Sequence, residues 1–241
     1  MAHYDIFREQ LAIKYPAYGH ALWEPSPGEL YCPVEVGDVG YIREGRFHRL
    51  FNALLPAKHQ SHQTFGVPEY HEPLKPNTSK HIDSSTLRPN DFCSAGVVAS
   101  DEPDCRALGP DDYSEISFSC TRKRGAVLSL PVLARREDTV ARGVFGKWIV
   151  KHIDSWFAWA RQLGLGIDRM EDIILVTGHH RARSWANVAF YESPPDARIS
   201  FGVEVTSDPG TRIKWKFSRK RTQGAVFHWG PEGEVRWCVL C

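Results

Sequence analysis

A single amphipathic stretch, residues 138–163, constrains the fold of this chain more than any other part of the sequence. Its apolar side chains recur at every third or fourth position over about six turns, which is the spacing of an α-helix with one broad buried face. The positions on this face are Val140, Val144, Phe145, Trp148, Ile149, His152, Ile153, Trp156, Phe157, Ala160 and Leu163. Asp138 or Thr139 can cap the start of this helix, and Gly164 and Gly166 can end it. A helix with this face needs a sheet to cover it.

The two sides of the predicted helix differ in character. We expect Trp148, Ile149, Trp156 and Phe157 to be buried against the sheet, while Lys147, Lys151 and Asp154 face water. The run 141–148 imitates a phosphate-binding loop, but Trp148 stands where that motif needs Ser or Thr, and the run lies inside a helix. We therefore interpret Gly143 and Gly146 as positions that let the helix approach the sheet closely.

The rest of the chain indicates strands. Runs of β-branched and aromatic residues alternate with turn residues, and their close spacing favours antiparallel pairing over βαβ units. Expected strands are 34–36, 39–42, 47–50, 95–99, 116–120, 126–130, 173–177, 185–190, 199–205, 213–217, 225–229 and 234–239. We therefore predict an α+β fold, in which a mostly antiparallel sheet or sandwich packs against the long helix and a short helix at 4–15 begins the chain.

The length and composition fit one domain covering residues 1–241. With 42% apolar residues the chain has ample material for a core. The range 56–114 is rich in Pro and His and offers one strand candidate, so we expect an irregular excursion there, which either wraps the surface or carries function.

Charge and cysteine usage limit the function classes. The formal net charge is +1, so the whole molecule does not attract nucleic acid or anionic membrane, and no specific nucleic-acid motif is present. The sequence shows no secretory leader and no transmembrane stretch, which predicts a cytoplasmic protein. The six scattered cysteines are expected to be reduced thiols.

Two basic segments share a local pattern. FSCTRKRGAVL (118–128) aligns without gaps on FSRKRTQGAVF (217–227), and each is predicted to be a strand, a basic tip and a second strand. Either a hairpin has been duplicated, or both segments reflect ordinary hairpin chemistry. If the tips lie side by side they could bind an anionic partner. The candidate residues are Arg122, Lys123, Arg124, Arg219, Lys220 and Arg221.

A second candidate anion site is the segment 177–184, which we expect to be a turn after a buried strand. Its candidate residues are His179, His180, Arg181 and Arg183. Because no Gly-rich nucleotide loop accompanies them, a solvated turn is the alternative interpretation.

Histidines in the range 59–81 suggest a metal site, since imidazole is a ligand for zinc and iron. The candidates are His59, His62 and His71. No second tight pair of ligands supports them, so polar loop histidines are the alternative, and we expect no cofactor.

The C-terminal residues Cys238-Val239-Leu240-Cys241 allow three interpretations. As a C-a-a-X motif they would direct prenylation to Cys238, although Cys is not a usual last residue of that motif. As C-x-x-C they could form a dithiol or metal site. The alternation of Val235, Trp237 and Val239 with polar neighbours instead favours a strand.

Four blocks carry a resemblance. VEVGDVGYIREGRFHRLFNALLP (34–56), FGVPEYHEPL (65–74), LPVLARREDTVARGVFGKWIVKHIDSWFAWARQLGLG (130–166) and EDIILVTGHHRARSWANVAF (171–190) resemble a lineage-expanded group of cytosolic proteins from mushroom-forming fungi. This resemblance implies a fungal source and a cytosolic location, and it assigns no catalytic residue.

Two function classes follow from these observations. We favour a non-catalytic binding or signalling module whose partner is a protein or an anionic surface. A variant of it is a pore-forming or membrane-disrupting effector. The alternative is a small-molecule enzyme that uses the His-rich loop or the 177–184 turn. No nucleophile elbow, Cys–His signature or assignable carboxylate pair supports catalysis.

Overall fold

The fold was established from a computed structural model, which describes residues 1–25, 33–75, 82–88, 90–99, 113–192, 197–206, 212–220, 224–230 and 237–240. It is an α+β fold of four small antiparallel sheets, one long helix and a short N-terminal helix, as the sequence predicts. The helices are α1 (His3–Lys14) and α3 (Arg142–Gln162), with short 3₁₀ turns at Pro16–Tyr18, Gln60–His62 and Met170–Asp172.

Two of the sheets are built from the same four passes of the chain. The first sheet contains β3 (Ile82–Leu87), β8 (Ala134–Thr139), β10 (Gly178–Ala182) and β15 (Trp237–Leu240), in the order β15-β10-β8-β3. The second contains β4 (Asn90–Cys93), β7 (Gly125–Leu130), β11 (Trp185–Phe190) and β14 (Val226–Gly230), in the order β14-β11-β7-β4. In the chain, β3 leads into β4, β7 into β8 and β10 into β11. The strands of each pass occupy matching positions in the two sheet orders, so each pass bends from one sheet into the other. Pro131, which has no N–H to donate, lies at one of these bends.

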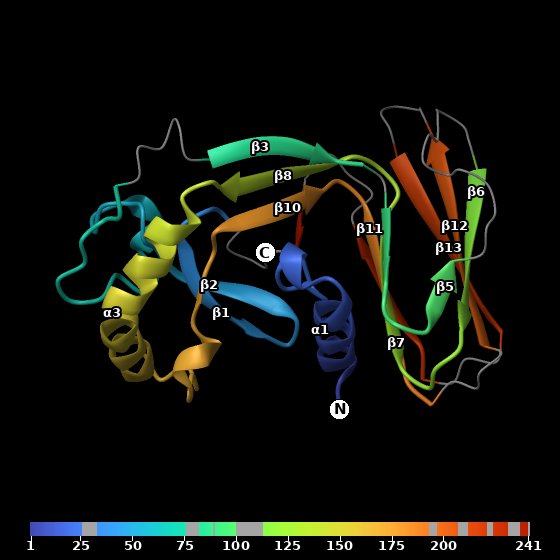
Figure 1. Ribbon diagram of the computed structural model, residues 1–241, viewed down its shortest axis with the longest axis horizontal. Coiled ribbons are helices and arrows are strands. Elements are labelled where there is room, and N and C mark those ends of the chain that lie inside the picture. Colours follow the sequence, from blue (N-terminus) through green and yellow to red (C-terminus); the bar gives the residue numbers. More distant parts are fainter. Residues whose placement is uncertain are drawn as a thin grey trace.

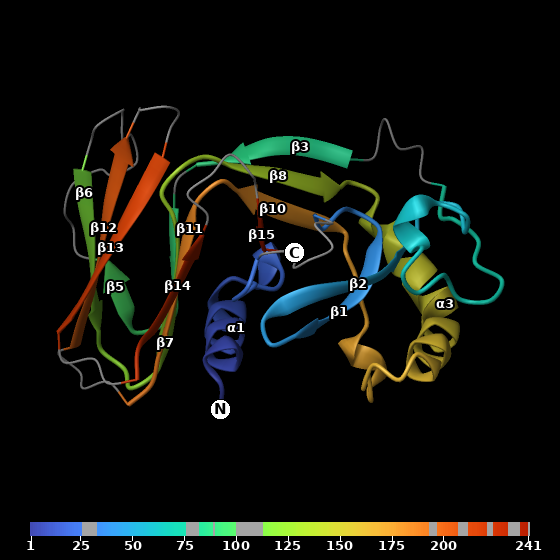
Figure 2. The ribbon, with the colours of Figure 1, turned by 180° about the vertical axis from the view of Figure 1, so that it is seen from behind.

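The third sheet contains β5 (Val97–Ala99), β6 (Tyr113–Cys120), β12 (Ala197–Thr206) and β13 (Arg212–Lys220), in the order β13-β12-β6-β5. It faces the second sheet across a core that includes Phe118, Val127, Val188, Phe190 and Ile199. The two sheets form a sandwich at one end of the molecule (Figure 1). The sheet β15-β10-β8-β3 extends from it like a bridge, with α1 packed beneath (Figures 1 and 2).

The fourth sheet, β2-β1-β9, lies at the other end of the molecule and is covered by α3 (Figure 2). Its strands are β1 (Asp38–Arg43), β2 (Arg46–Asn52) and β9 (Ile174–Leu175). Trp156 of the helix is 3% exposed and packs with Val39, Leu50 and Phe51 of the sheet. The predicted packing of the helix on a sheet is therefore confirmed.

The structure corrects several details of the helix. The helix begins at Arg142 rather than at 138, because Asp138 and Thr139 belong to β8, where strand pairing on both sides satisfies the backbone. The three expected core residues Trp148, Ile149 and Phe157 are partly buried rather than fully buried. Lys147, Lys151 and Asp154 are exposed, as predicted.

The two glycines of α3 also differ from expectation. Gly143 and Gly146 are exposed, and a Cβ added to either would meet nothing within 4 Å. The interpretation that they allow close packing on the sheet is therefore wrong. Gly164 and Gly166 do end the helix, and both have positive φ values of 68° and 65°, a conformation that glycine adopts without steric cost.

Several polar strands were not predicted. β3, β8 and β10 carry few apolar residues, so their sequences lack the alternation that identifies a half-buried strand. The segment 34–36 is not a strand, whereas the range 56–114, in which we expected one strand, contributes β3, β4 and β5.

Candidate functional site

The basic tip at Arg122–Arg124 connects β6 to β7 at one end of the sandwich. Arg122, Lys123 and Arg124 are all exposed, and no described carboxylate forms an ion pair with any of them. Within the described part of the chain, these three adjacent cations are therefore not neutralised and can contact an external anion.

The neighbouring turn at Gly96 holds this tip in place. The backbone N–H and the hydroxyl of Thr121 both donate to the Gly96 carbonyl, at 2.7 and 3.0 Å. Gly96 has φ +84°, and a Cβ there would lie 2.4 Å from Cγ of Arg122. The turn thus needs glycine both for its conformation and to make room for the arginine stem.

The second basic segment, 219–221, leads from β13 toward β14 at the same end of the sandwich. Arg219 and Lys220 are the last residues of β13, but their side chains, and Arg221 altogether, lie outside the described residues. The sheet order places β12 between β6 and β13, so the backbone at Lys220 lies two strand spacings, about 10 Å, from Ser119 at the end of β6 that leads into the tip. The strands that flank each segment belong to facing sheets and do not pair with each other, so the hairpin interpretation is wrong.

A further cation, Arg198, lies between the two segments. It is exposed on β12, where it pairs with Ser119 of β6 on one side and Lys220 of β13 on the other. Sequence reasoning missed it, although the alternation with buried Ala197 and Ile199 marks it as outward-facing. We call the set Arg122, Lys123, Arg124 and Arg198, with the β13 positions of Arg219 and Lys220, the basic end.

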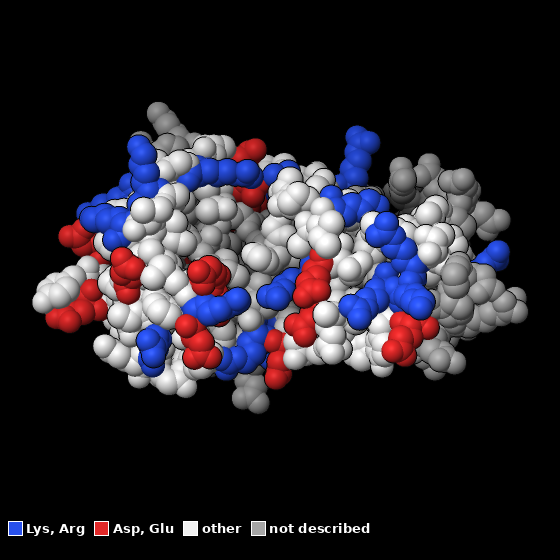
Figure 3. Space-filling view, turned by 60° about the horizontal axis from the view of Figure 1, so that its bottom comes forward, with Lys and Arg blue, Asp and Glu red and all other residues white. Residues whose placement is uncertain are grey.

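Acidic side chains also lie close to the basic end, because β11, which Glu192 follows, pairs with β7 at Phe190 and Gly125. Figure 3 shows charges of both signs interspersed over one face of the molecule. Glu192, in the turn that follows β11, is exposed. The net charge of +1 does not exclude local attraction of an anion, because attraction depends on the charges near the contact surface.

The second candidate site, 177–184, is not a solvated turn. Residues 178–182 form β10, a central strand of the bridging sheet. His179 and His180 are 1% and 3% exposed, whereas Arg183 is exposed. Arg181 donates to the Val34 carbonyl at 2.5 Å. These four residues therefore do not converge on one accessible anion site.

Burial sets the ionisation of the two histidines. Desolvation lowers the pKa of His180 to about 4, and the guanidinium of Arg136 acts in the same direction. Desolvation also lowers the pKa of His179, as does the nearby charge of Arg181. Both imidazoles are therefore neutral at pH 7.

The three candidate metal ligands are brought together in the structure. The ring centroids of His59 and His62 are 6.1 Å apart, and those of His62 and His71 are 5.9 Å apart. Their ring nitrogens, however, are used by the protein. His62 Nε2 accepts from the backbone N–H of Asn52 at 3.1 Å, and Nε2 of His71 lies 2.9 Å from the Leu55 carbonyl. Among the described residues, no group of three or more ligating side chains has the geometry of a metal site.

A buried carboxylate that the sequence did not reveal lies beside this loop. Asp38 is fully buried and accepts from Arg49 at 2.6 Å, from Asn52 at 2.8 Å and from the Glu35 N–H at 2.7 Å. Desolvation raises its pKa to about 6 against the opposing effect of Arg49. Because the Asn52 N–H in turn donates to His62, these residues form one network that anchors the loop to β1 and β2.

Cys238 lies in β15, opposite Arg181 of β10. The strand predicted at 234–239 is thus found at 237–240. The side chain of Cys238 and all of Cys241 lie outside the described residues, so lipidation of Cys238 stays a prediction.

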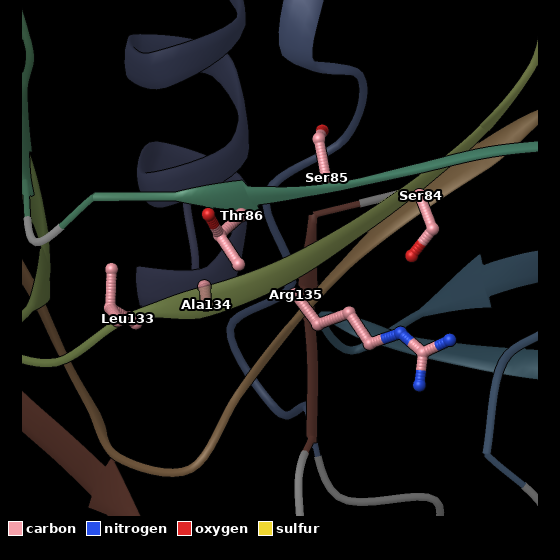
Figure 4. A pocket seen from close by; sticks show the side chains of 6 residues that line it. All are labelled: Ser84, Ser85, Thr86, Leu133, Ala134 and Arg135. Atoms are coloured by element: carbon pink, nitrogen blue, oxygen red, sulfur yellow. The ribbon is translucent and has the colours of Figure 1, made fainter.

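A groove of about 420 Å³ lies along β3 and the start of β8. Figure 4 shows its lining: Ser84, Ser85, Thr86, Leu133, Ala134 and Arg135. Arg135 forms an ion pair with Glu137 at 2.7 Å, so its charge is already neutralised within the protein. None of the histidines predicted as ligands lines this groove.

Comparison with known proteins finds no significant match to this chain among family models, curated proteins or solved structures. Within the described part of the chain, no helix is both long and apolar enough to cross a membrane.

Proposed function

We propose that this protein is a non-catalytic binding module that attaches to an anionic surface through the basic end of its sandwich. The supporting observation is the tip Arg122–Arg124, where three consecutive exposed cations have no described acidic partner. The packed core of the sandwich supports this tip from below, and the Gly96 turn fixes its position. A rigid scaffold with exposed charges at a loop tip is a common arrangement for recognition.

The geometry supports binding better than catalysis. The histidine pair predicted as a catalytic candidate is at most 3% exposed, and the loop histidines are engaged with the backbone. The groove beside β3 contains hydroxyl groups and one paired arginine. Enzyme sites more often combine a concave pocket with several convergent groups of perturbed pKa.

The proposal is tested by measuring attachment to vesicles of phosphatidylcholine with and without phosphatidylserine. Each basic residue near an anionic surface contributes about 1 kcal/mol. Reversing three charges in the variant Arg122→Glu, Lys123→Glu, Arg124→Glu should therefore weaken attachment about 100-fold or more. Attachment of the parent should also weaken steeply as salt is raised, because exposed charges are screened.

A matched control separates local from global charge. The variant Lys58→Glu, Lys75→Glu, Lys147→Glu changes the net charge equally, and all three lysines are exposed and lie outside the sandwich. It should retain most of the parent's attachment. Equal losses in the two variants would show that the basic end is not the contact surface, and no attachment of the parent at low salt would reject the proposal.

A further inference from the structure

Two adjacent histidines are buried in the middle of the bridging sheet. His179 and His180 lie on β10, and neither nitrogen of either ring has a partner among the described residues. A buried polar group normally finds a partner, and an unpaired one destabilises the fold by about 1–3 kcal/mol. Burial favours the neutral form of both rings, because an imidazolium at either position would lose its hydration.

His179 faces one side of the sheet. Its Nε2 lies 3.5 Å from a carboxylate oxygen of Glu137 on β8 without forming a hydrogen bond. Arg181 follows on the same face of β10, and Glu35 approaches from the loop before β1. Of these charges, Arg181 opposes protonation of His179 more strongly than either carboxylate alone favours it.

His180 faces the opposite side, toward α1 and the turn that follows it. Its ring lies 5.7 Å from the ring of Tyr18. Across the sheet it pairs with Arg136 of β8, whose guanidinium is bound to Asp138, and on the other side with Leu240 of β15. Arg136 opposes protonation of His180, and Asp138 favours it only in part because that carboxylate is already paired.

The position of β10 means that a change at its histidines would affect the connection between the two ends of the molecule. This strand pairs with β8 and β15 inside the bridging sheet, and at its other end it continues into β11 of the sandwich. Separation of β10 from β8 would therefore loosen the bridge between the α3 end of the molecule and the sandwich (Figure 1).

We propose that His179 and His180 form an acid-sensitive latch, in which protonation of the two rings below neutral pH opens the bridging sheet at β10. In the closed sheet both rings are buried beside arginines, whereas in the opened strand they reach water. Protons therefore bind the open form more strongly, and acidification shifts the population toward it.

The size of the response follows from linkage. A histidine that titrates at 6.5 when exposed and at about 4 in the closed sheet favours the open form roughly 30-fold more at pH 5 than at neutral pH. His179, whose pKa is also lowered, adds to this factor. The closed sheet is therefore fully stable relative to the open form above pH 6.5, and this stability is lost progressively as the pH falls toward 4.

Hydrogen exchange of the full chain tests the latch. After correction for the intrinsic pH dependence of exchange, amides of β8 and β10 should exchange at least roughly 30-fold faster at pH 5 than at pH 7.5, while β7 and β11 change little. In the variant His179→Phe, His180→Phe, which keeps ring shape and removes titration, this acceleration should disappear. The control His3→Phe, in α1, should behave like the parent.

Three results would overturn the proposal. These are an unchanged rate for β10 in the parent, an acceleration that persists in the double variant, and an equal acceleration in every strand, which would indicate general acid unfolding. If the double variant does not fold, His179→Phe and His180→Phe are measured singly, and each must reduce the acceleration.

Discussion

Replacement of Trp156 by alanine is the sharpest test of the contact between α3 and the sheet β2-β1-β9. The indole is 3% exposed and meets the ring of Phe51 edge-on, with centroids 5.4 Å apart. A buried tryptophan removes about 150–250 Å² from water, which corresponds to roughly 4–6 kcal/mol at 25 cal/mol per Å². Large-to-alanine changes in protein cores cost about 3–5 kcal/mol. We therefore expect Trp156→Ala to lower the free energy of unfolding by about 4 kcal/mol.

Guanidinium unfolding followed by far-ultraviolet circular dichroism measures this change. Val150→Ala is the matched control, because Val150 lies on the same helix and is 76% exposed. It should change the free energy of unfolding by no more than about 0.5 kcal/mol. If Trp156→Ala unfolds at the same denaturant concentration as the parent, the packing assigned to α3 is wrong.

Three further predictions concern two glycines, one histidine and two cysteines. Gly146→Ala should stabilise the protein by about 0.5–1 kcal/mol in thermal unfolding, because alanine has a higher helix propensity than glycine and its methyl group would meet no other atom within 4 Å. Gly40→Ala should destabilise it, since a Cβ there would lie 2.2 Å from a backbone oxygen. His62→Ala should cost about 1–3 kcal/mol by leaving a buried N–H of β2 unpaired, and the loss should be the same with a metal chelator present; a chelator that destabilises the parent equally would instead indicate a bound metal. Cys93 and Cys120 should resist iodoacetamide at pH 8 until the protein unfolds, because burial raises their pKa values to about 12 and 11; rapid alkylation of the native protein would contradict their burial.

The sequence predicts the apolar parts of this fold well and the polar parts poorly. The predicted strand at 185–190 coincides with β11, and that at 126–130 matches β7 within one residue, because each is a buried run of mostly apolar residues. β8, with the sequence ARREDT, has no such run. Its strand conformation comes from pairing with β3 and β10, which are distant in sequence, so local pattern alone could not reveal it.

Among the candidate sites, too, some features were predictable from the local sequence and others were not. Exposure of Arg122–Arg124 was predictable, because a short basic run between two apolar strands belongs at a turn. The burial of His179 and His180 was not, since polar residues after a short strand usually indicate a solvated turn. Only the packing of α1 and the loop before β1 around β10 makes them interior residues.

Acetylation of lysines in the presence and absence of anionic vesicles tests the central claim most directly. Lys123 belongs to the basic end, whereas Lys147 lies on the exposed side of α3 at the other end of the molecule. With phosphatidylserine vesicles at low salt, acetylation of Lys123 should slow markedly while acetylation of Lys147 is unchanged. Equal rates at Lys123 with and without vesicles, under conditions where the protein is attached, would contradict the account and place the contact surface elsewhere.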